Sequence, residues 1–176
     1  MCCFEDHLIL QTERLFLREF TKKDAAFFLR LVSTSEYKNG IYDTGITSEA
    51  QARDYIEKSL RGLYRKFGFG LWVMCDRETQ NPLGMAGIIS RDCLPEVDLG
   101  YALLPEHFRK GYTFEACQAV CEYARISLNR PQILAVVSPT NAPSIALLHK
   151  LGFYFKGIVQ PPKGGETLNQ YAKALV

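Results

Sequence analysis

The continuous apolar run QILAVVS at residues 132–138 restricts most strongly what this chain can fold into. A run of strand length in which apolar residues do not alternate with polar ones is typical of a β-strand that is covered on both faces. We therefore expect this segment to be a central strand of the sheet.

Other segments predict the rest of that sheet. The opening strand is expected at 14–20, where Leu15 and Leu17 occupy every second position. Three consecutive strands of an antiparallel meander are predicted from FGLWVMC, LGMAGIIS and VDLGYALL, at 69–75, 83–90 and 97–104. Two closing strands are expected near 153–159 and 167–175, around the loop QPPKGGE at 160–166.

Four segments carry helix start signals followed by apolar stripes of helical spacing. They are 22–33, which follows Thr21; 48–67, which begins at Ser48; a long helix after Gly111; and a short helix between Asn141 and Gly152. The predicted order is β-α-α-β-β-β-α-β-α-β-β, a mixed α/β fold in which we expect residues 1–176 to form one domain.

Composition excludes several classes of protein. The formal net charge of +2 is too small to indicate a nucleic-acid surface. No apolar stretch predicts a membrane span, and Glu5 and Asp6 stand where a secretory signal needs apolar residues. The six cysteines form no CxxC pair, which is typical of reduced thiols and predicts a cytoplasmic protein. We interpret Cys117 and Cys121 as small apolar residues on a buried helix face and expect no metal site.

The segment HFRKGYTFEACQAVCEYA at 107–124 places Arg109, Lys110 and Gly111 directly ahead of the long helix. The first N–H groups of a helix have no internal partner and attract anions. A residue without a side chain at Gly111 would let these N–H groups approach a phosphate, and the two cations add charge beside it. The alternative is a loop glycine with two solvated cations, and this segment alone does not decide between them.

Three separated segments resemble the GNAT superfamily of N-acetyltransferases, and within it the RimJ/RimL-like branch. LQTERLFLREF resembles the branch's opening T-E-R-L-x-L-R strand, and DLGYALLPEHFRKGYTFEA resembles its G-Y-x-L-x-P-E-x-W-G-K-G-Y-A-T-E-A stretch. NAPSIALLHKLGF resembles its N-x-x-S-x-x-L-x-x-x-L-G-F helix. These similarities span nearly the whole chain, and the predicted order of elements agrees with the GNAT fold.

The resemblance implies acetyl-coenzyme A as co-substrate, bound where the strands at 97–104 and 132–138 run side by side and then splay apart. The pantetheine arm is expected along Ala102, Leu103 and Leu104. The pyrophosphate is expected on Phe108, Arg109, Lys110, Gly111, Tyr112 and Thr113. Asn141 is either a cofactor amide partner or a helix N-cap. Phe108 and Thr113 depart from the superfamily's usual residues, although the Thr113 hydroxyl can donate to a phosphate oxygen.

Acetyl transfer requires a group that takes a proton from the attacking amine. Alternation along the strand places Glu96 and Asp98 on one face, and Val97, Leu99 and Tyr101 on the other. A carboxylate there can accept the proton directly or through water, and Asp98 matches the position of the catalytic glutamate in many relatives. A solvated carboxylate at a strand end is the alternative for both acids. A backbone N–H near Ala102 or Leu103 is expected to stabilise the oxyanion.

The departing thiolate needs a proton as well. Many superfamily members supply it from a tyrosine on the fourth helix, and the matching position here is Leu148. Ser144 lies one turn earlier on the same helix face and reaches similar space. We predict Ser144 as the proton donor or a cofactor contact, with self-capping of its helix as the alternative.

The acceptor is predicted to be a primary amine, either a protein N-terminus or a small molecule. Tyr37, Tyr42 and the loop at 160–166 are expected to border its site. The alternative function is a regulatory or interaction domain that binds coenzyme A without efficient catalysis, which the changes at Leu148 and Thr113 leave open. We expect no nucleic-acid or membrane partner, and either a monomer or a homodimer.

Overall fold

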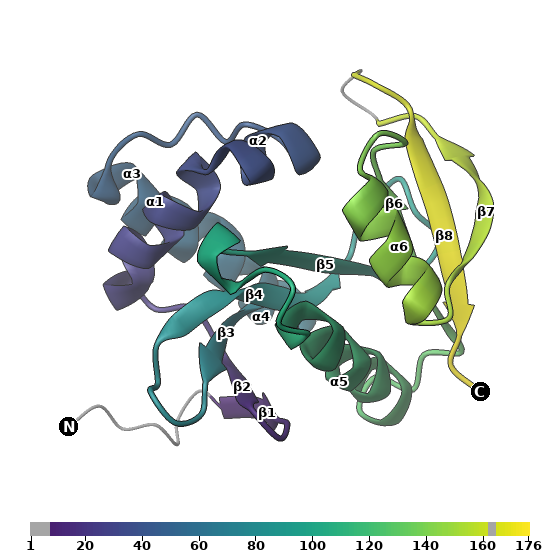
Figure 1. The fold of residues 1–176 in the computed structure, drawn as a ribbon, viewed down its shortest axis with the longest axis horizontal. Helices are drawn as coiled ribbons and strands as arrows, with labels where there is room; N and C mark the ends of the chain where they lie inside the picture. Colours follow the sequence, from purple (N-terminus) through teal and green to yellow (C-terminus); the bar gives the residue numbers. More distant parts are fainter. Residues whose placement is uncertain (1–7, 162–164) are drawn as a thin grey trace.

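A computed structural model describes residues 8–161 and 165–176, and it has one eight-stranded mixed sheet in the order β1-β2-β3-β4-β5-β6-β8-β7 (Figure 1). The strands are β1 (Leu8–Gln11), β2 (Leu15–Arg18), β3 (Leu71–Asp76), β4 (Pro82–Ile89), β5 (Asp98–Leu103), β6 (Gln132–Val137), β7 (Tyr154–Val159) and β8 (Leu168–Ala174). The helices are α1 (Ala25–Ser33), α2 (Ser35–Gly40), α3 (Glu49–Tyr55), α4 (Arg61–Phe67), α5 (Tyr112–Ile126) and α6 (Ala142–Lys150). The predicted mixed α/β class and the meander of β3, β4 and β5 are confirmed.

Two elements of the fold were not predicted from the sequence. β1 is a four-residue strand at the edge of the described sheet, where it pairs with β2, and so short a strand carries too few residues to show alternation. α2 is a six-residue helix whose N-cap is Thr34. The helix expected at 48–67 is interrupted by a π-helical turn at Ile56–Leu60 that separates α3 from α4.

The central position of β6 is confirmed. β6 lies between β5 and β8, and Ile133, Leu134 and Ala135 are buried. It pairs with β8 along its whole length but with β5 at one position, Asp98↔Leu134. This pairing includes the hydrogen bond from Leu134 N–H to the Val97 carbonyl at 2.9 Å. Beyond this point the two parallel strands separate, as the resemblance to the GNAT superfamily predicted.

Two layers of helices cover the faces of the sheet (Figure 1). On one face, Trp72 of β3 and Ile88 of β4 pack with α5 and with Leu148 of α6. On the other face, Val73 and Met85 pack with residues of α1 and α3. No helix in residues 8–161 and 165–176 has the length and apolar character needed to cross a bilayer.

Candidate active site

A cavity of about 850 Å³ occupies the region where β5 and β6 separate. Its walls come from β5, β6, α2 and α6, with further side chains from α1, α3, α4, β3, β4 and β8 and from the loops around them. The cavity therefore uses the part of the sheet that lacks continuous strand pairing.

The side chains of β5 alternate between the two ends of this cavity. Tyr101 and Leu103 pack against the core cluster that contains α5 and α6, and both line the cavity. Ala102 packs against the cluster that contains α1 and α3, and it lines the cavity as well. We name the two ends the α6 side, with Tyr101, Leu103, Asn141 and Ser144, and the α2 side, with Tyr37, Tyr42, Tyr55 and Ala102. The cavity thus extends from one face of the sheet to the other past the edge of β5.

The backbone of β5 also has two edges. Leu104 N–H donates to the Leu83 carbonyl of the β4 side, and the Val97 carbonyl accepts from Leu134 of β6. Because backbone groups of an antiparallel pair alternate in direction, those of Tyr101 and Leu103 point toward the opening and those of Ala102 point toward β4. Of the two amides expected to stabilise an oxyanion, Leu103 is the one on the open edge.

Leu104, like Ala102, directs its backbone toward β4, whereas Leu103 directs its backbone toward the opening. The Leu104 N–H is bonded to Leu83, its carbonyl accepts from His107 N–H at 3.0 Å, and its side chain is buried in the core. Both backbone groups of Leu104 therefore already have partners within the protein.

The N-terminus of α5 has no side-chain cap. Gly111 is the N-cap residue at φ 81°, in the left-handed region, and Arg109 also has a positive φ of 61°. The N–H groups of residues 111–114 have no acceptor among the residues that the structure describes. Phe108 lines the cavity with 41% of its surface exposed, and Arg109 and Lys110 are exposed. The predicted phosphate-binding residues thus form an open helix N-terminus next to the cavity.

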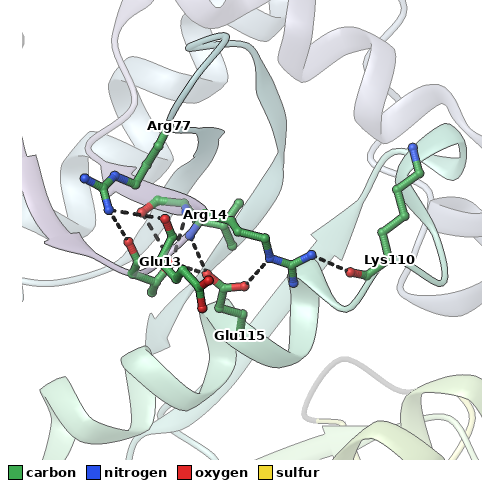
Figure 2. Close-up of polar contacts among 7 residues, drawn as sticks. Glu13, Arg14, Arg77, Lys110 and Glu115 are labelled. Carbon is green, nitrogen blue, oxygen red and sulfur yellow. Dashed lines mark hydrogen bonds and ion pairs between the residues drawn. The ribbon is translucent and has the colours of Figure 1, made fainter.

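A hydrogen-bond network around Arg14 holds the segment directly before α5 in place (Figure 2). The Arg14 guanidinium donates from Nε to Glu115 Oε2 at 2.7 Å and from Nη1 to the Lys110 carbonyl at 2.8 Å. Glu115 Oε1 accepts from Arg14 N–H and from the Thr12 hydroxyl. Burial raises the pKa of Glu115, but these hydrogen bonds outweigh it and lower the pKa below its ordinary value. The Arg14 guanidinium also lies 4.7 Å from the Tyr112 ring centre.

This network adds a second reason for glycine at position 111. A β-carbon there would lie 3.3 Å from Arg14 Nη2, so the guanidinium would have to shift slightly, and the positive φ is unfavourable for residues with a side chain. The approach of a ligand, the reason expected from the sequence, stays a prediction, and the positive φ and the contact with Arg14 independently favour glycine at this position.

The N-terminus of α6 is capped, in contrast to that of α5. Asn141 Oδ1 accepts from Ser144 N–H at 3.2 Å, and Asn141 Nδ2 donates to the Gly40 carbonyl of α2 at 3.4 Å. The N-cap interpretation of Asn141 is therefore confirmed, and the same side chain joins α6 to α2 across the cavity.

Tyr101 and Ser144 form a hydrogen-bonded pair that lines the cavity. Their hydroxyl oxygens lie 2.6 Å apart, and burial is the main reason that the pKa of Tyr101 is raised well above its ordinary value. Tyr101 was not predicted as a functional residue. Its place on the face opposite Asp98 was visible in the strand alternation, but its contact with Ser144 joins residues 43 positions apart.

The two predicted carboxylates differ in environment. Asp98 is fully buried and accepts from Arg91 Nε at 3.0 Å on both oxygens. Burial raises its pKa to about 6, although Arg91 opposes this shift. Glu96 is half-buried, with one oxygen 3.9 Å from Arg130 Nη1. The described lining of the cavity includes Arg91 but neither carboxylate, so contact between Asp98 and a bound amine requires a relay.

A family model for the acetyltransferase (GNAT) domain matches residues 14–154. The chain belongs to the GNAT family. The uncharacterized N-acetyltransferase p20 of Bacillus licheniformis is 34% identical over 156 residues, which are 86% of this chain and 85% of that protein. The chain is thus a GNAT acyltransferase.

Solved structures agree with the GNAT fold. The crystal structure of an acetyltransferase from Agrobacterium tumefaciens str. C58 has a TM-score of 0.78 and 26% identity, covering 98% of this chain and 97% of that one. RimL, a ribosomal L7/L12 alpha-N-protein acetyltransferase solved in complex with coenzyme A, has a TM-score of 0.79 at 15% identity, covering 95% of this chain and 97% of its own. The RimJ/RimL-like resemblance predicted from the motifs is supported.

GNAT proteins use acetyl-coenzyme A as the acetyl donor. Leu148, which stands where many superfamily members have the proton-donating tyrosine, is buried in the core. The predicted Ser144 lines the cavity together with Tyr101. Tyr37 and Tyr42, which are predicted to border the acceptor, line the α2 side of the cavity. Of the expected loop at 160–166, residues 162–164 lie outside the described part of the chain. Within the described ranges, no cluster of three or more His, Cys, Asp or Glu side chains suits a metal ion.

Proposed function

We propose that this GNAT protein transfers an acetyl group from acetyl-coenzyme A to a primary amine by direct attack in a ternary complex. The observation that carries the proposal is the cavity that crosses the sheet at the splay, with an uncapped helix N-terminus beside it. Such a cavity lets a donor and an acceptor approach the edge of β5 from opposite faces.

The donor is assigned to the α6 side. The free N–H groups at the start of α5 bind the pyrophosphate, with Arg109 and Lys110 adding positive charge. The backbone of Leu103, on the open edge of β5, pairs with the pantetheine arm or donates to the oxyanion that forms during attack. Leu104 has no part in this assignment because its backbone groups are already bonded.

Proton transfer is assigned to groups on opposite faces of β5. The Tyr101 hydroxyl lines the cavity and is hydrogen-bonded to Ser144, and a tyrosine is protonated at neutral pH, so the pair can supply a proton to the departing thiolate. Asp98 is ionised above about pH 6 and can accept the amine proton through water. Glu96, which is held near Arg130, is the weaker candidate for the base.

The acceptor is assigned to the α2 side. The Tyr42 and Tyr55 hydroxyls lie 3.0 Å apart there, and apolar side chains such as Phe28, Leu60 and Leu63 surround them. A polyamine needs several carboxylates, and Glu36 is the one carboxylate in the described lining. These surroundings favour a single amine on an apolar or aromatic body.

Release of free thiol from acetyl-coenzyme A tests the proposal against a panel of small amines and N-terminal peptides. We expect release that depends on the amine and on both Tyr101 and Gly111. Tight coenzyme A binding without amine-dependent release across the whole panel would reject catalysis in favour of a coenzyme A-binding regulatory domain.

A further inference from the structure

A single cation lines the described part of the cavity. Arg91 and Glu36 are its only charged side chains, and Arg91 comes from the loop that joins β4 to β5. Glu36 is exposed in the first turn of α2 and accepts from the Ser35 hydroxyl. An acceptor on the α2 side therefore meets one guanidinium among mainly neutral groups.

Asp98 holds this guanidinium in a fixed orientation. Arg91 donates through Nε to both Asp98 oxygens, and the carboxylate is fully buried beneath it. Nη1 and Nη2 of Arg91 have no partner among the described residues, and the side chain keeps 42% of its surface exposed. Four N–H donors thus remain on a guanidinium that is already ordered.

We propose that Arg91 binds a carboxylate of the acceptor, so that the substrate is an amine that also bears a carboxylate on an aromatic or apolar body. The inference rests on the proposed acetyl transfer and specifies its substrate class. A planar guanidinium binds a carboxylate through two parallel hydrogen bonds, and an edge that is ordered in advance loses little entropy on binding. The aromatic groups of the α2 side, Tyr37, Tyr42 and Tyr55, then contact the remainder of the substrate.

Three probes that share an aromatic body test the role of the carboxylate. L-Phenylalanine carries it, L-phenylalaninamide has a neutral amide in its place, and 2-phenylethylamine has neither. At saturating acetyl-coenzyme A, and with rates corrected for the fraction of free amine, we expect kcat/KM for phenylalanine to exceed that of the other two about tenfold. Equal values for the three amines would overturn the inference and leave the transferase function standing.

Variants connect this preference to Arg91. Arg91→Gln is expected to remove the preference, whereas Arg53→Gln, at an exposed arginine of α3 outside the cavity lining, is expected to retain it. Because Arg91→Gln leaves the buried Asp98 without its partner, Arg91→Gln/Asp98→Asn provides a second test that leaves no unpaired charge. Calorimetry with coenzyme A present should show phenylalanine binding to the native protein and at least about tenfold weaker binding to the double variant.

Binding and turnover separate the two proposals. Phenylalanine binding that depends on Arg91, without thiol release from any amine, would reject the transferase function and retain the carboxylate site. Thiol release with undiminished phenylalanine binding in the double variant would reject the carboxylate site alone.

Discussion

The helices α5 and α6 pack in the same core cluster on one face of the sheet, and their N-termini differ. Asn141 caps α6, and no side chain caps α5, whose N-cap is Gly111. Both ends are nevertheless fixed, since Arg14 bonds the Lys110 carbonyl and Asn141 bonds the Gly40 carbonyl. The difference shows how one fold separates two tasks: an ordered but uncapped terminus can bind an anion, and a capped terminus can hold a side chain such as Ser144 in position.

Gly111→Asp is expected to have the largest effect on the difference between the two helix N-termini, because it changes the uncapped terminus of α5. The substitution places a negative charge and a side chain at a positive φ beside Arg14, so we expect the coenzyme A Kd to rise about a thousandfold. Calorimetry measures the affinity, and the far-ultraviolet circular dichroism spectrum should remain unchanged. Affinity equal to that of the native protein would show that the diphosphate does not bind at α5.

Replacing Tyr101 tests the protonation of the departing thiolate, which we assign to the α6 side of the cavity. Tyr101→Phe removes the hydroxyl that bonds to Ser144, and we expect kcat to fall about a hundredfold with little change in KM for acetyl-coenzyme A. Ser144→Ala should have a smaller effect, because water can replace its hydroxyl. A Tyr101→Phe variant with native kcat would assign the proton donor elsewhere.

Replacing Asp98 tests the role of general base, which we assign to the face of β5 opposite Tyr101. If Asp98 is the base, native kcat/KM falls as pH drops below about 6, and Asp98→Asn lowers it about thirtyfold and removes that pH dependence. An unchanged pH profile in the variant would exclude Asp98 as the base.

The same pKa shift affects stability with a defined sign. The folded pKa of about 6 lies above the ordinary value of 3.8, so the folded state binds this proton more tightly than the unfolded state. Asp98 therefore makes the free energy of unfolding decrease as pH rises between about 4 and 6. Denaturant titrations across this window should show that component in the native protein but not in Asp98→Asn.

Arg14 tests whether the order of the α5 loop matters. Arg14→Ala frees the Lys110 carbonyl and Glu115, and we expect the coenzyme A Kd to rise about tenfold while the affinity for pantetheine, which lacks the pyrophosphate, stays the same. Arg14→Lys should recover part of the loss. Equal losses for both ligands would indicate general destabilisation.

Of these substitutions, removing the N-cap of α6 should have the smallest effect on the affinity for coenzyme A. Asn141→Ala is expected to cost about 1 kcal/mol of stability and to leave the coenzyme A Kd within about threefold of the native value. A loss of affinity as large as that of Gly111→Asp would mean that both termini bind the phosphate.

Sequence patterns predicted the parts of the fold that depend on local periodicity and capping. The buried run of β6, the β3–β5 meander and the N-cap Asn141 were predicted correctly because each is determined by a few neighbouring residues. β1 and α2 were missed because each is too short to show a period.

The candidate site was harder to predict because its side-chain pairs join distant residues. The Tyr101–Ser144 hydrogen bond and the Arg14–Glu115 ion pair connect residues 43 and 101 positions apart. The Arg91–Asp98 pair is closer in sequence, but the sequence does not show that Asp98 is buried or that Arg91 lines the cavity. A position on a strand face follows from alternation, whereas a partner across the sheet follows only from the three-dimensional packing.

A crystal structure of the protein with bound coenzyme A tests the central claim most directly. We predict that diphosphate oxygens accept hydrogen bonds from the backbone N–H groups at the start of α5, with the pantetheine arm running into the opening between β5 and β6. A diphosphate bound at the start of α6 or elsewhere on the surface, with the opening unoccupied, would contradict the account.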